Sequence, residues 1–125
     1  MKVPHLSEDE DGSSHFGEIE LDVQEIDRRG HLVRISETLP AVGARFMSAG
    51  AGASMAPHPA PQRQLMVVVQ GQWECIASDG ESRLFGPGGF VLMEDVDGVG
   101  HTTNNLPGDP VLTVAVGLAP KEGAT

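Results

Sequence analysis

Apolar and polar residues alternate with a period of two along most of this 125-residue chain. Between residues 16 and 23, the sequence FGEIELDV places Ile19, Leu21 and Val23 on one face and three acids on the other, which predicts a half-exposed strand. The same pattern, interrupted by Gly and Pro, predicts roughly nine strands. They cover residues 16–23, 31–39, 43–50, 64–71, 72–78, 82–85, 89–94, the stretch around 100–104, and 110–118.

No segment keeps a 3.6-residue apolar period over three turns, so the expected fold is all-β. Asp79-Gly80 is a strong hairpin-turn signal between two of these strands. The strand at 64–71 is apolar on both faces, which suits a central strand or one that a partner subunit covers. Short strands separated by Gly and Pro turns are typical of a sandwich or a jelly-roll barrel.

Negative charge is concentrated near the N-terminus. The chain has 8 Lys and Arg against 18 Asp and Glu, a formal net charge of −10, and nine of the acids lie in the first 27 residues. A field of this sign repels nucleic-acid phosphates and anionic lipids, so we expect no nucleic-acid partner and no membrane partner. No signal peptide or transmembrane run is evident, and we expect a cytoplasmic protein.

The length predicts a single domain. We expect an acidic N-terminal arm over residues 1–13, one domain over 14–118 and a C-terminal tail over 119–125. The only cysteine, Cys75, excludes an intrachain disulfide and a thiolate zinc site. No neighbouring base or second cysteine accompanies it, so we assign Cys75 a structural role. Core packing explains Trp73, which shares its strand face.

Two histidines, His58 and His101, lie at the edges of predicted core strands. Residues 58–71 read His-x-Ala-xxx-Gln-xxxxxx-Gly, and residues 98–105 read Gly-x-x-His-xxx-Asn. In these two motifs the chain resembles the cupin superfamily, and in particular a group of small single-domain bacterial cupins, over roughly residues 14–118. The resemblance implies a cupin-like jelly-roll β-barrel, also called a double-stranded β-helix.

The resemblance also implies a metal site, which this chain carries only in part. Typical cupins hold a divalent metal with three His and one Glu, whereas Ala60 and Gln64 stand at two of those positions here. A divalent transition metal bound by His58, Gln64 and His101 would be held less tightly than one with a carboxylate ligand, because an amide brings no charge. Iron-dependent oxygen chemistry is therefore disfavoured. We expect no nucleotide or organic cofactor, since the chain has no Gly-rich phosphate loop.

Several polar and apolar side chains are expected to join the histidines. Counting by two from His58 places Gln62, Gln64 and Met66 on the face that cupins turn inward. Arg45 would bind an anionic substrate through its guanidinium, although a surface ion pair also explains this residue. The candidate ligand contacts are Gln64, Met66, Gln62, Arg45, Met47 and His15.

Three carboxylates, Glu94, Asp95 and Asp97, closely precede His101. One of them would complete a metal site or orient the imidazole, whereas loop acids are more often simply solvated. A histidine at a strand end is likewise more often structural than functional. The motif spacing favours function, and His58 and His101 are the catalytic candidates.

The resemblance implies a small-molecule enzyme that uses the interior of the barrel. Isomerase, cyclase or lyase-type chemistry, with histidine acid–base catalysis or weak metal assistance, fits the residues better than oxygenation. The alternative is a non-catalytic binding or sensing cupin, since two of the four metal ligands are missing. We expect a homodimer, because the doubly apolar strand at 64–71 needs cover on both faces.

Overall fold

In the computed structural model, the described residues, 1–121, form twelve strands and no helix, which confirms an all-β fold. The strands are β1 Lys2–Glu8, β2 Ser14–Glu20, β3 Val23–Arg28, β4 His31–Ser36, β5 Ala41–Ala49, β6 Ser54–His58, β7 Gln64–Gln70, β8 Trp73–Ala77, β9 Ser82–Phe85, β10 Phe90–Met93, β11 His101–Asn105 and β12 Val111–Leu118. Over this range, nothing helical is long and apolar enough to span a bilayer. Most of the expected tail at 119–125 lies outside the described residues.

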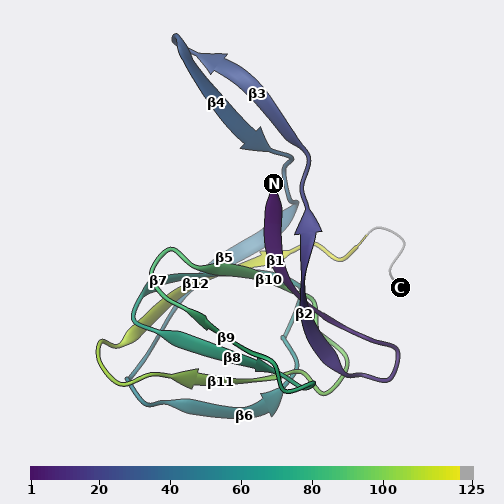
Figure 1. Ribbon diagram of the computed structural model, residues 1–125, viewed down its shortest axis with the longest axis vertical. Coiled ribbons are helices and arrows are strands. Elements are labelled where there is room, and N and C mark those ends of the chain that lie inside the picture. Colours follow the sequence, from purple (N-terminus) through teal and green to yellow (C-terminus); the bar gives the residue numbers. More distant parts are fainter. Residues whose placement is uncertain (122–125) are drawn as a thin grey trace.

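Two sheets face each other, and a separate hairpin projects away from them (Figure 1). The larger sheet has six strands in the order β2-β1-β10-β7-β12-β5, and the smaller has four in the order β6-β11-β8-β9. The hairpin consists of β3 and β4. Within the described part of the chain, no strand pairing joins the two sheets, so their hydrogen bonds do not close a barrel.

The space between the sheets holds the main core. Met66 and Val68 of the larger sheet and Trp73 and Cys75 of the smaller sheet belong to one buried cluster. Along β7, burial alternates from Gln64 onwards, as expected for a strand whose side chains point to opposite faces in turn. The inward face predicted for this strand is thereby confirmed.

The N-terminus differs from the expected acidic arm, because Lys2–Glu8 forms β1 between β2 and β10. Leu6 is fully buried and Val3 is 5% exposed. These two apolar residues are three positions apart and pack into separate clusters, so they show no period of two. The acids that suggested an arm begin only at Glu8, where this strand ends.

Two further differences concern strands near the hairpin. The single strand predicted for residues 16–23 is divided, since β2 ends at Glu20 and β3 begins at Val23. The chain leaves the larger sheet at this break and enters the hairpin. β6 was not predicted, because its five residues include Pro57 and lack clear alternation.

A charged cluster around Glu94 joins distant segments. The carboxylate of Glu94 accepts hydrogen bonds from His5 Nε2 at 2.7 Å and from Arg63 Nε at 2.6 Å, and Lys121 Nζ lies 3.2 Å away. The His5 bond is the largest of the effects that together lower the pKa of Glu94 to about 2, against the opposing effect of burial. The cluster fastens β1, the loop before β7 and residue 121 to the end of β10.

Glu94 should make the stability of the protein depend on pH under acidic conditions. Its folded-state pKa lies below the ordinary value of 4.5, so its contribution is complete above that pH and is lost as pH falls from 4.5 towards about 2. We expect the free energy of unfolding to fall more steeply over this range in the wild type than in Glu94→Gln. Urea unfolding at stepped pH measures the difference, and parallel curves would contradict the role assigned to the carboxylate.

Candidate active site

Two histidines meet between the sheets. His58 ends β6, His101 begins β11, and the two residues are direct partners in the antiparallel pairing of these strands. Their ring centroids are 4.6 Å apart and the rings are tilted by 57°. The structure therefore brings together the two catalytic candidates, which are far apart in the sequence.

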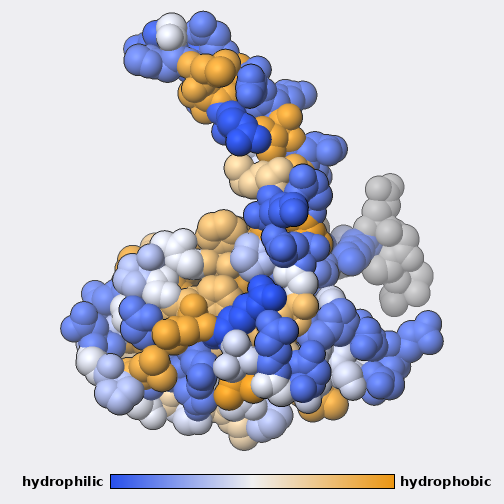
Figure 2. All heavy atoms as spheres, in the orientation of Figure 1, coloured by the Kyte–Doolittle hydropathy of each residue, from blue (hydrophilic) through white to orange (hydrophobic). Residues whose placement is uncertain are grey.

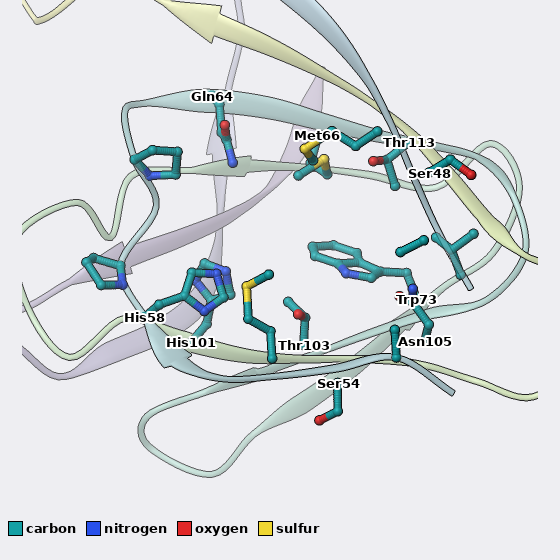
Figure 3. Close-up of a pocket in the computed structure, with 17 residues that line it drawn as sticks. Ser48, Ser54, His58, Gln64, Met66, Trp73, His101, Thr103, Asn105 and Thr113 are labelled. Atoms are coloured by element: carbon teal, nitrogen blue, oxygen red, sulfur yellow. The ribbon is translucent and has the colours of Figure 1, made fainter. Parts of the chain in front are cut away.

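The histidines line a cavity of about 460 Å³, a size typical of small-molecule sites. Figure 3 shows the two imidazoles side by side, with Gln64 across the cavity from them. Of the residues that the structure describes, no Lys, Arg, Asp or Glu lines this cavity. Its lining includes Met47, Met55, Met66, Trp73, Thr103, Asn105 and Thr113.

Asp95 orients the imidazole of His101. Its Oδ2 lies 2.6 Å from His101 Nδ1, and both side chains are buried. A carboxylate accepts, so Nδ1 carries the proton and the neutral ring presents the lone pair of Nε2. The other oxygen, Oδ1, is buried without a hydrogen-bond partner among residues 1–121. Of the three acids considered from the sequence, Asp95 is the one that contacts the histidine.

His58 is fixed in the same tautomer by a different contact. Its Nδ1 lies 2.9 Å from the carbonyl oxygen of Ala56. A carbonyl oxygen only accepts, so Nδ1 is the donor and Nε2 of the neutral ring remains an acceptor. Both imidazoles can thus act as proton acceptors through Nε2 in an uncharged cavity.

A close backbone approach places the histidines next to each other. Gly100 has a φ of +81°, and a Cβ there would lie 1.9 Å from the carbonyl oxygen of His58. Only glycine fits this position. Ser14 Oγ donates to the carbonyl oxygen of Gly100 at 2.7 Å and accepts from the backbone nitrogen of Ser78 at 2.8 Å. The turn before His101 therefore lies between the backbone of His58 and the side chain of Ser14.

Five of the candidate site residues share this cavity, namely Met47, His58, Gln64, Met66 and His101. Gln62 does not line it, and instead its side chain lies against Gly117. The prediction for Gln62 assumed an extended segment from His58 onwards, but residues 59–63 form a loop and β7 begins only at Gln64. The period of two therefore does not extend through position 62.

Arg45 and His15 also lie outside the cavity. Arg45 shares a face of β5 with Met47 but is exposed at the sheet edge and does not reach the lining. His15, on β2, pairs with Asp9 at 2.8 Å and is 40% exposed. The structure therefore gives neither residue a contact with the two histidines.

Sequence reasoning did not find Met55, Thr103 or Thr113 as lining residues. His101 pairs with His58 and Thr103 with Met55, so β6 has one extra residue between the two pairs. This irregularity lets His58 and Met55, three positions apart, line the same cavity. Nothing in the sequence marks it, whereas alternation along β11 and β12 would have indicated the two threonines.

The donor set does not fit a tightly held divalent metal. Two imidazole nitrogens and the Gln64 amide face the cavity, and the described residues contain no group of three His, Cys, Asp or Glu placed to share an ion. Gln64 Nε2 makes only a long contact of 3.9 Å with Met93 Sδ. Without an anionic ligand, any divalent ion would be weakly bound.

Cys75 is fully buried, and burial raises the pKa of its thiol to about 12, with a further contribution from the negative charge of Asp95. The thiol is protonated at neutral pH and is a poor nucleophile. These properties agree with the structural role expected from the sequence.

The Gly100→Ala variant should be less stable than the wild type by at least about 2 kcal/mol, because the new methyl group meets the His58 backbone in a strained conformation. Gly80→Ala is the matched control, since Gly80 has a φ of +98° but open space around it. Chemical denaturation of both variants separates the clash from the strain. Equal losses in the two would contradict the close approach.

Adding a carboxylate should create a stronger metal site. In Gln64→Glu, two imidazoles and one carboxylate would face the cavity, and we expect Co²⁺ affinity to rise at least about tenfold over the wild type. Cobalt absorption during titration measures this, with Gln62→Glu as the control outside the cavity. A rise in both variants would contradict the assignment of Gln64 to the site.

Comparisons with known proteins give a match in structure but none to a protein family. The chain matches no protein-family profile and no curated protein sequence. Among solved structures it is similar to a conserved protein of unknown function from Streptococcus pyogenes. The similarity has a TM-score of 0.48 and 15% identity, and it covers 82% of this chain and 76% of that chain.

Proposed function

We propose that the protein is a small-molecule enzyme of the isomerase, cyclase or lyase type, in which histidines move a proton on a substrate held in the cavity. The observation that supports this most is the buried pair of His101 and Asp95 beside His58. A histidine whose far nitrogen is bound by a carboxylate is a common arrangement for a general base, because the carboxylate stabilises the imidazolium that forms.

We also propose that the two facing sheets are a jelly roll of the cupin kind that is not fully closed. The motif positions His58, Gln64 and His101 all line the space between the sheets, which is where the resemblance expects a site. The antiparallel pairing of the two histidine-bearing strands agrees with the same arrangement.

The proposed reaction begins with proton abstraction by Nε2 of His101. The proton comes from a carbon beside the substrate carbonyl. The electron pair of that carbon–hydrogen bond forms a carbon–carbon double bond, and the π pair of the carbonyl moves to its oxygen, which gives an enolate. Asp95 stabilises the resulting imidazolium through the bond to Nδ1. Return of the proton to another carbon completes an isomerisation, whereas loss of a leaving group completes an elimination. His58, next to His101, is the second group able to carry a proton.

The lining restricts the class of substrate. No Lys, Arg, Asp or Glu among the described residues lines the cavity, so no guanidinium or ammonium group there would pair with a carboxylate or phosphate. Methionine and tryptophan side chains supply apolar contacts, and two threonines and an asparagine supply polar ones. An uncharged, mostly apolar carbonyl compound fits this environment.

A second candidate is a binding or sensing protein without catalysis. Ala60 and Gln64 stand at two positions where typical cupins have metal ligands, so the site has no anionic metal donor. This difference favours a binding role. A protein of this kind would bind the same class of molecule and release it unchanged.

Substitution at the two central residues distinguishes these proposals. With carbonyl and polyene metabolites as substrates and products analysed by mass, His101→Ala should lower the rate on the order of 10² to 10⁴-fold. Asp95→Asn should lower kcat and shift its pH profile, since the amide cannot stabilise the imidazolium. His31→Ala, at an exposed site of the hairpin, is the control. Binding of these compounds without conversion would refute the enzyme proposal in favour of the binding protein.

A further inference from the structure

The face of the larger sheet opposite the core carries an apolar row. Val114 pairs with Phe46 on one side and with Val67 on the other, and Val67 pairs with Phe90, so the row crosses four strands. Val68, the next residue along β7, points the other way into the core. Phe46 is 78% exposed and Phe90 is 37% exposed. This row is an uncovered hydrophobic surface.

The projecting hairpin has an uncovered apolar face of its own. Ile26 pairs with Val33, and alternation places Ile35 on the same face, whereas the pair of Glu25 and Arg34 lies on the other. Within residues 1–121, β3 and β4 pair with each other and with no other strand. A two-stranded hairpin alone in water is marginally stable at best. The apolar face therefore needs a partner surface.

Figure 2 shows hydrophobic side chains along the hairpin and on the body beneath it. The hairpin points away from its own sheets, so it does not cover the apolar row of its own chain (Figure 1). One chain thus has two uncovered apolar surfaces that it does not bring together itself.

The solvent-exposed area of the chain is larger than expected for a folded monomer of its size, which agrees with an apolar surface that a partner covers. A folded monomer of 13.2 kDa is expected to expose about 6,400 Å². This chain exposes 7606 Å², an excess of about 1,200 Å² over that expectation. A stable interface of ordinary size buries about 800 Å² on each partner, so the excess is large enough for one.

The charge distribution favours a second copy as the partner. Two chains with a net charge of −10 repel each other over most of their surfaces. Residues 41–57, which include β5 and all of β6 except His58, are exposed and contain only one charged residue, Arg45. The four residues of the apolar row are uncharged as well. Repulsion between copies is therefore weakest at this edge and face, and charge depletion is typical of the centre of an interface.

We propose that two copies form a two-fold dimer in which the apolar face of each β3–β4 hairpin covers the apolar row of the partner's larger sheet. Two-fold symmetry makes the contact reciprocal, so both uncovered surfaces of both chains are buried at once. This proposal is independent of the chemistry proposed for the cavity.

Sedimentation velocity of charge variants tests the interface. The wild type should sediment as a dimer at micromolar concentration, and Phe46→Asp and Ile35→Asp should each raise the dissociation constant at least about tenfold. Leu84→Asp is the matched control, because Leu84 is 56% exposed on β9 of the smaller sheet. Circular dichroism checks that each variant is folded. A monomeric wild type, or a dimer weakened by Leu84→Asp and by neither of the other two, would overturn the proposal.

Hydrogen exchange on the wild-type protein tests the hairpin without any substitution. The amides of Val23–Arg28 and His31–Ser36 should be protected at high protein concentration and should lose that protection on dilution, while β7 stays protected throughout. Hairpin amides that exchange equally fast in dimer and monomer would show that the hairpin does not dock on the partner.

Discussion

The central position of β7 is the constraint on which most of this structure depends. This strand pairs with β10 and β12, and its side chains are apolar on both faces. One face supplies Met66 and Val68 to the core and Gln64 and Met66 to the cavity. The other supplies Val67 to the outer apolar row. A single strand therefore contributes to the core, the cavity and the outer surface, because neither of its faces is polar.

The sequence made three features predictable, each by a different signal: the continuous apolar run at 64–71 predicted β7, the Asp79-Gly80 pair predicted a turn, and the period of two along the other strands predicted the all-β class. The parts that could not be predicted depend on tertiary contacts instead. β1 is held by buried residues that do not alternate, and the irregularity in β6 has no local signal. The independent hairpin was not foreseen, because the break between β2 and β3 interrupts a pattern that otherwise reads as one strand.

His58, His101 and Gln64, which the motif spacing singled out, line one cavity, but the spacing could not assign roles to the neighbouring acids. Glu94 and Asp95 are adjacent in the chain, but their side chains contact different groups. Glu94 binds the cations of the charged cluster, and Asp95 binds the imidazole of His101. The direction of each side chain depends on where β10 ends. From composition alone, the two acids are therefore equally good candidates for the contact with His101.

Because Cys75 is buried, its reaction with a thiol reagent reports the separation of the two sheets. The only thiol in the chain lies between the two sheets, and its pKa of about 12 keeps it unreactive in the closed molecule. A thiol reagent can therefore reach it only in molecules whose sheets have separated. The rate of labelling would report the population of those molecules without an engineered cysteine, and there is no second cysteine to confuse the signal. Such a measurement would also show how firmly the walls of the cavity are held together, since Trp73 of the same strand lines that cavity.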